Sequence, residues 1–76
     1  MQRCYFAEGT DGAIFRNNTC KNIGTAAVEW GGGSAGSEST GGQITDNTFI
    51  GPVPQSGWIV IRSGSAATVT NNSYLP

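Results

Sequence analysis

The segments FRNNTC (residues 15–20), ITDNTF (residues 44–49) and VTNNSY (residues 69–74) decide the fold of this chain. Each begins with an apolar residue, carries Asn or Asp at its third position and Asn at its fourth, continues with Thr or Ser, and ends with a bulky or sulfur-containing side chain. The copies start 29 and 25 residues apart. A repeat of roughly 20–50 residues is typical of proteins that stack one structural unit on the next.

A short apolar element precedes every copy of this motif: YFA at residues 5–7, VEW at residues 28–30 and IVI at residues 59–61. In the first and third copies, it lies eight residues before the next apolar stretch. In the middle copy, Trp30 lies 14 residues before Ile44, because the segment 31–42, made only of Gly, Ser, Ala, Thr and Glu, intervenes. We interpret this segment as an inserted Gly/Ser-rich surface loop; a flexible linker is the alternative.

The composition favours strands over helices. Gly, Ser, Thr and Asn make up 33 of the 76 residues, and Ile and Val number 10 against one Leu and one Met. β-Branched residues favour strands, whereas helices favour Leu, Ala, Glu and Lys. No stretch of the sequence approaches the ~20 apolar residues that a membrane-spanning helix needs. We therefore predict an all-β chain that does not insert into a membrane.

Each repeat is interpreted as one coil of a parallel β-helix, in which short strands alternate with tight Asn-containing turns. Because the Asn side-chain amide can bond to groups above and below it, Asn18, Asn47 and Asn72 are expected to form a ladder along one corner. The expected inward rows are Phe15/Ile44/Val69, Cys20/Phe49/Tyr74, and either Tyr5 or Ala7 with Trp30 and Ile61. Residues 1–76 would thus form a single module of about three coils.

The short length leaves little room for a core. A domain of this size buries only ~60% of the surface of its unfolded chain and is marginal unless it is stapled, binds metal or associates. Cys4 and Cys20 allow at most one intrachain disulfide, and two thiols without histidine make a poor metal site. We expect reduced thiols, a reducing compartment and no metal or cofactor, so that oligomerisation supplies the missing stability.

Charge and residue types exclude further classes of function. Four basic and five acidic residues give a net charge of −1, and the chain has no histidine. Without a basic surface to hold phosphates, the chain is not expected to bind nucleic acid. Without histidine, it cannot use the histidine-based forms of acid–base or nucleophilic catalysis.

The copies at residues 44–49 and 69–74 resemble coils of the right-handed parallel β-helix family, as found in pectate lyases and phage tailspikes. The resemblance covers residues 4–76 and is specific for the fold rather than for an activity. It implies a right-handed solenoid. The short stack, the absence of a signal-peptide pattern at the N-terminus and the expected free thiols favour a tailspike, most like a C-terminal segment, over a secreted lyase.

As a tailspike-like segment, the chain would be a structural and assembly module. The resemblance implies a homotrimer, with a longer tailspike chain as a further partner, that supports recognition of a cell-surface polysaccharide. Its location would be the virion tail, after assembly in the host cytoplasm. The same resemblance implies one alternative, a fragment of a β-helix polysaccharide lyase or glycoside hydrolase.

Glu29 and Glu8 are the candidates for that enzymatic alternative, because glycan hydrolases use paired carboxylates. Alternation places Glu29 outward on its strand and Glu8 outward on the equivalent strand one coil away. Both are more readily explained as solvated strand charges, and Arg62, which aligns with Glu8 two coils away, is too distant from it for an ion pair. Asp46 is expected to be structural, since the other two copies carry Asn there. Catalysis by this chain alone is not expected.

Exposed aromatic residues are the other candidate site. Phe6, Trp58 and Val60 are expected to point outward if their strand neighbours point inward. Outward Phe and Trp on a Gly- and Ser-rich surface indicate a contact with another molecule. A subunit interface around a threefold axis is favoured because it also accounts for the small size, and stacking against a sugar ring is the alternative.

Overall fold

The computed structural model describes residues 2–32 and 36–76. This part of the chain forms short β-strands joined by turns and contains no helix, which confirms the predicted all-β class. The strands are β1 (Tyr5–Ala7), β2 (Ile14–Arg16), β3 (Thr19–Lys21), β4 (Val28–Trp30), β5 (Gly42–Thr45), β6 (Thr48–Ile50), β7 (Ile59–Ile61), β8 (Ala67–Thr70) and β9 (Ser73–Leu75).

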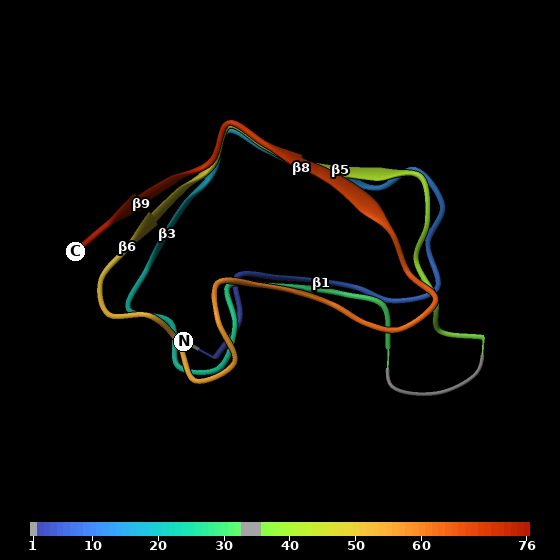
Figure 1. Cartoon of the computed structure of the whole chain (residues 1–76), viewed down its shortest axis with the longest axis horizontal. Helices are drawn as coiled ribbons and strands as arrows, with labels where there is room; N and C mark the ends of the chain where they lie inside the picture. The colour runs from blue at the N-terminus through green and yellow to red at the C-terminus, as the bar shows by residue number, and fades with distance from the viewer. Residues whose placement is uncertain (1, 33–35) are drawn as a thin grey trace.

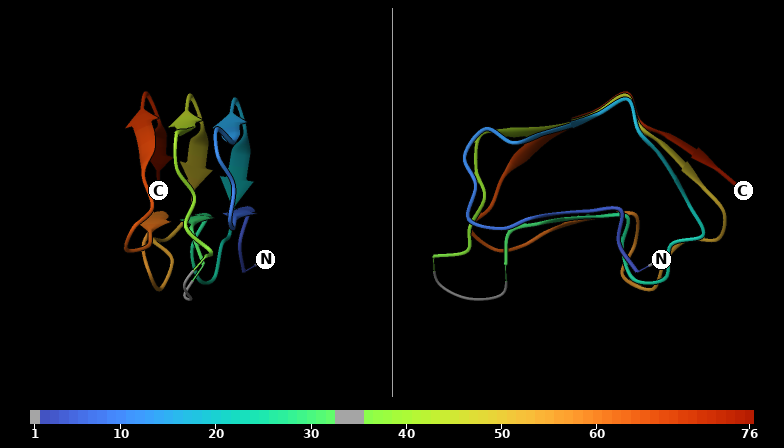
Figure 2. Two further views of the ribbon diagram at one scale, coloured as in Figure 1. Left: turned by 90° about the vertical axis from the view of Figure 1, so that its right-hand side faces the viewer. Right: turned by 180° about the vertical axis from the view of Figure 1, so that it is seen from behind.

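The strands form three parallel sheets, in the orders β1-β4-β7, β2-β5-β8 and β3-β6-β9. The chain therefore runs through the three sheets in the same order three times, and we call each of these runs a pass. Viewed down the shortest axis of the molecule, the passes lie nearly on top of one another (Figure 1). Figure 2 shows them side by side, with the second pass between the first and the third.

The register of the strands brings the repeated motifs into three rows. The paired positions are Phe15, Ile44 and Val69 in one row, Cys20, Phe49 and Tyr74 in the next, and Ala7, Trp30 and Ile61 in the third. The first two rows are those predicted. In the third row, Ala7 rather than Tyr5 is the partner of Trp30, because Tyr5 pairs with Val28.

A left-handed turn follows the middle strand of every pass. Asn17, Asp46 and Asn71 come directly after β2, β5 and β8, and their φ angles are 59°, 57° and 56°. Asn and Asp tolerate this conformation better than other side chains with a Cβ atom. Asp46 thus occupies the same turn position as its two Asn counterparts, which agrees with the structural role expected for it.

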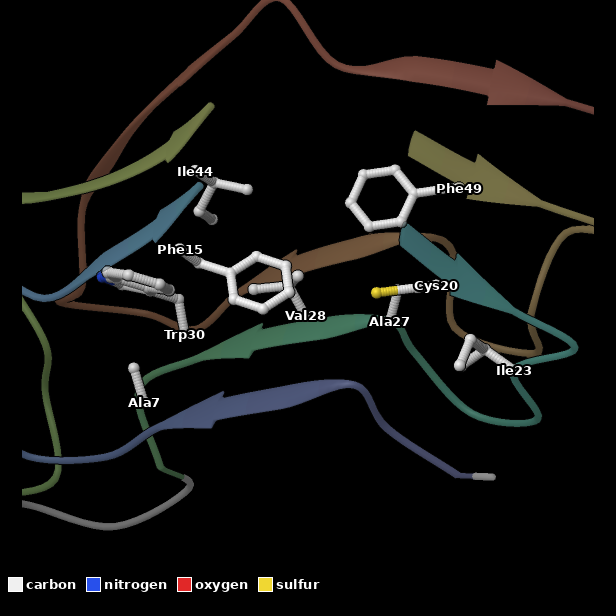
Figure 3. Packing of buried hydrophobic residues seen from close by; sticks show 9 residues of the cluster. All are labelled: Ala7, Phe15, Cys20, Ile23, Ala27, Val28, Trp30, Ile44 and Phe49. Atoms are coloured by element: carbon white, nitrogen blue, oxygen red, sulfur yellow. The ribbon is translucent and has the colours of Figure 1, made fainter. Parts of the chain in front are cut away.

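The core lies in the first and second passes. Its buried side chains come from all three sheets and converge between them (Figure 3). Trp30, Ile44 and Phe49 are fully buried, because the second pass is covered on both sides. Val69 and Tyr74 occupy the same rows in the third pass, yet they are 40% and 50% exposed. One end of the stack is therefore open.

Two predictions about local structure were wrong. Cys4 and Cys20 form a disulfide, with 6.2 Å between their Cα atoms, and are not free thiols. Gln2 and Cys4 are hydrogen-bonded to the segment 25–27 that leads into β4, and this path places Cys4 beside the inward-facing Cys20. The segment 31–42, of which residues 33–35 lie outside the described residues, is not simply a surface loop, because Ser39 is buried and Gly42 begins β5.

Candidate functional site

The structure joins Asn18, Asn47 and Asn72 by hydrogen bonds along one corner. The Oδ1 atom of Asn47 accepts from the backbone N–H and the Nδ2 of Asn18, at 3.0 and 3.3 Å. In the same way, Oδ1 of Asn72 accepts from the backbone N–H and the Nδ2 of Asn47, both at 3.0 Å. We call these three residues the Asn ladder. Each of its steps links one pass to the next.

The amide groups of the ladder also bond to the backbone. Asn47 Nδ2 donates to the carbonyl oxygen of Phe15, and Asn72 Nδ2 donates to that of Ile44, each at 3.0 Å. Asn47 is 1% exposed. A buried amide that lost these partners would keep its desolvation cost without compensation. The ladder therefore stabilises the contact between passes, and its central amide is not available to an external ligand.

Glu29 lies on the outer face of the sheet β1-β4-β7 and is nevertheless buried. One carboxylate oxygen accepts from Arg3 Nε at 2.7 Å. The other accepts from Arg62 Nη2 at 2.8 Å and from Arg62 Nε at 3.0 Å. Arg3 precedes the first pass and Arg62 follows β7 in the third. We call this arrangement the Arg–Glu–Arg bridge, since a single carboxylate connects both ends of the stack.

The environment of Glu29 keeps it ionised. Burial alone raises the pKa of its carboxyl group, but the hydrogen bonds and charges of Arg3 and Arg62 outweigh burial, and the pKa is lowered. A general acid needs the opposite, a pKa raised toward neutral pH. The expectation that Glu29 is a solvated strand charge was wrong, because two long cationic side chains reach it from the neighbouring passes.

Glu8 does not share the position of Glu29. Phe6 is the strand partner of Glu29, while Glu8 follows β1 two residues further along and is exposed. Both oxygens of Glu29 are already bound by guanidinium groups. The arrangement therefore lacks the two available carboxylates that hydrolysis of a glycosidic bond requires.

The three residues expected to point outward have different environments. Phe6 is 42% exposed, and Glu29 separates it from the half-buried Val60 two passes away. The Arg3 guanidinium carbon is 5.1 Å from the centre of the Phe6 ring. Trp58 instead packs against the core, with its ring stacked on Phe49 at 5.5 Å. The outward prediction for Trp58 was wrong, because Trp58 precedes β7, where strand alternation does not apply.

Ser39 is a connecting residue that sequence reasoning missed. It is fully buried, and its Oγ donates to the Ala7 carbonyl at 3.0 Å and accepts from the Thr10 N–H at 3.2 Å. Its own N–H donates to Ser65 Oγ at 3.0 Å. Thr10, Ser39 and Ser65 thus form a third connection through the three passes, after the Asn ladder and the Arg–Glu–Arg bridge. The hydroxyl group that each of these residues carries was the only feature of the sequence that pointed to this connection.

Other kinds of site find no support within residues 2–32 and 36–76. No group of three or more His, Cys, Asp or Glu side chains there could hold a metal ion. No helix in the same residues is long and apolar enough to cross a membrane. A hollow of about 280 Å³ is lined by Gly41, Gly42, Gln43, Ala66, Ala67 and Thr68. This lining carries no ionisable side chain.

Comparison with known proteins gives no match to any protein-family model, curated protein or solved structure. The chemistry of the candidate site must therefore be read from its own residues. The Asn ladder and the Arg–Glu–Arg bridge both use their polar groups to connect passes.

Proposed function

We propose that this chain is a structural and assembly module of a phage tailspike-like protein. In this proposal, it is a short right-handed parallel β-helix that associates as a homotrimer and supports recognition of a host-surface polysaccharide. The observation that carries the proposal is that the buried polar residues bond to neighbouring passes. Asn47, predicted as a ladder residue, and Glu29, a candidate for catalysis, are both buried and bonded to neighbouring passes.

The register of the passes supports the β-helix. Parallel pairing repeats in the three sheets, and residues 29 and 25 apart along the motif become neighbours, as in Phe15, Ile44 and Val69. A stack of this kind buries its core by covering each unit with the next. Such a module serves as a rigid rod, and its stability depends on what covers its ends and sides.

Phe6 supports lateral association. It is an exposed aromatic residue on the outer face of β1, with Val60 on the same face two passes away. Aromatic residues are enriched at the centres of subunit interfaces. Because Trp58 packs against the core, Phe6 is the central residue of the proposed trimer contact, and the Arg3 guanidinium lies over its ring.

Light scattering tests the trimer. We expect a mass of three chains at low micromolar concentration for the wild type and a lower mass for Phe6→Lys, because a lysine would bring like charges together at the threefold axis. Ile14→Lys is the matched control, since Ile14 is a 57% exposed residue on the outer face of β2. A folded wild-type monomer at these concentrations would contradict the proposal.

The enzymatic alternative has its own test. The low pKa and the occupied oxygens of Glu29 are unfavourable for acid–base catalysis. We expect no cleavage of pectic or capsular polysaccharides, measured as new reducing ends. Cleavage that Glu29→Gln abolishes would instead establish a fragment of a polysaccharide-degrading enzyme.

A further inference from the structure

The two ends of the stack are covered to different extents. In the first pass, the inward residues Phe15 and Cys20 are only 7% and 2% exposed. The Tyr5 ring stacks on Phe15 at 5.0 Å, and Cys4 is bonded to Cys20. In the third pass, the inward positions are open: Ile61, Val69 and Tyr74 are 39%, 40% and 50% exposed. We call this surface, together with the free edges of β7, β8 and β9, the C-terminal face.

The C-terminal face carries strand edges without a strand partner, and the strands of each sheet there run in the same direction. β7, β8 and β9 each pair with a neighbour on one side only, and so do β1, β2 and β3 at the opposite end. Unpaired edges of this kind are templates for pairing with another chain. Because all pairing in the described residues is parallel, another pass in the same direction would continue the sheets.

The Asn ladder shows which end matches the C-terminal face. In each step, the N–H of the earlier Asn donates to Oδ1 of the later one. At the C-terminal end, the Asn72 N–H meets no acceptor among residues 2–32 and 36–76, and at the other end no donor from these residues reaches Asn18 Oδ1. The two ends therefore complement each other. A twofold contact between C-terminal faces would instead bring together two ends that both present the Asn72 donor and lack the Asn18 acceptor.

We propose that the C-terminal face binds the N-terminal end of a second copy of this chain, head to tail. Asn18 of the second copy then continues the ladder by accepting from the Asn72 N–H. Its Nδ2, which donates to the Arg16 carbonyl at 2.9 Å in the single chain, donates to the Val69 carbonyl instead. That carbonyl holds the register position of the Phe15 and Ile44 carbonyls, which accept from Asn47 and Asn72. This contact rests on the proposed assembly function and adds an axial interface to the lateral one.

The dimensions of the molecule fit such an interface. The passes stack along the shortest axis, and the extents of the chain are 35 × 22 × 15 Å (Figure 1). An end face lies within a rectangle of 35 by 22 Å, about 770 Å², so two faces bury at most about 1,500 Å², against roughly 1,200–2,000 Å² for stable specific interfaces. Only a contact that covers most of the face reaches this range, as continuation of all three sheets would.

Sedimentation velocity over a wide concentration range tests the proposal. We expect the wild-type mass to rise above three chains without reaching a plateau, because a head-to-tail contact leaves a free end on every assembly. Val69→Lys, on the C-terminal face, is expected to require at least tenfold higher concentration for this growth. Gln43→Lys, on the outer side of β5 in the middle pass, is the matched control and is expected to behave as the wild type.

Tyr74→Lys is a second variant on the same face, and circular dichroism checks that each variant keeps its strands. Three results would overturn the proposal: a wild-type mass that does not rise with concentration, a discrete doubling, or growth in Val69→Lys and Tyr74→Lys equal to that of the wild type. A fixed trimer that Phe6→Lys disrupts would overturn only the axial contact. A mass that grows with concentration but is insensitive to Phe6→Lys would contradict the lateral trimer instead.

Discussion

Asn47 is the residue on which the contact between passes depends most. It is the only member of the ladder with an Asn partner on both sides, and its Nδ2 also donates to the Phe15 carbonyl. We expect Asn47→Ala to lower the free energy of unfolding by about 1–3 kcal/mol, because it leaves buried polar groups without partners. Urea denaturation measures the change, with exposed Gln43→Ala on the adjacent strand as control. Equal stability of the two variants would mean that the ladder contributes nothing.

Glu29 makes the free energy of unfolding depend on pH, and the direction of this dependence follows from the lowered pKa of its carboxyl group. Its pKa is lowered in the folded chain, so its contribution is present above the pKa of the unfolded state, about 4.3, and is lost as the pH falls through the lower folded value. We expect the wild-type free energy of unfolding to decrease when the pH drops below about 5. Glu29→Gln should be about 1–3 kcal/mol less stable at pH 7, because its ion pairs are lost.

The difference in the free energy of unfolding between the wild type and Glu29→Gln should become smaller as the pH is lowered. Exposed Glu8→Gln, at the end of β1, is the control and should leave the acid dependence close to that of the wild type. Urea titrations at several pH values supply the comparison. If Glu29→Gln retained the full acid dependence, the Arg–Glu–Arg bridge would not be its source.

At the scale of elements, the strands and turns of the motif could be predicted from the sequence. The spacing of Phe15, Ile44 and Val69 defined the row, and the repeated Asn defined the position of the tight turn. This success follows from periodicity, because a shift by one residue would turn the apolar row of each strand toward solvent. The members of the Asn ladder could be predicted for the same reason, because they hold the same position in each copy of the motif.

The remaining contacts could not be predicted, because they involve residues outside strands. Trp58 precedes β7, so alternation did not give its direction. Cys4 and Arg3 precede β1, and their contacts with Cys20 and Glu29 depend on the path of the chain before β1, which runs beside the segment 25–27. Spacing along the sequence does not specify such a path.

The disulfide is the element that holds the first pass closed. It joins the residue before β1 to β3, across a separation of 16 residues. Closing a loop of this length lowers the conformational entropy of the unfolded chain and thereby stabilises the folded chain by about 3 kcal/mol. We therefore expect reduction to lower the free energy of unfolding by about 2–4 kcal/mol. Urea denaturation with and without a thiol reductant measures this, and an unchanged midpoint would contradict it.

The whole molecule is a stack of three passes with one closed end and one open end. The second pass is buried because it has a neighbour on each side (Figure 2). The disulfide and Tyr5 cover the inward residues of the first pass. The third pass presents its inward row to solvent. The small size predicted a need for partners, and the proposed axial contact would meet that need at the C-terminal face.

The central claim is that the three copies of the motif stack in register, and nuclear Overhauser contacts in solution test it most directly. We predict contacts between the side chains of Phe15 and Ile44 and between those of Ile44 and Val69, residues 29 and 25 apart. Parallel neighbours in a sheet lie about 4.8 Å apart, within reach of this measurement. The absence of these contacts in the folded chain, or contacts that pair the strands antiparallel, would contradict the claim.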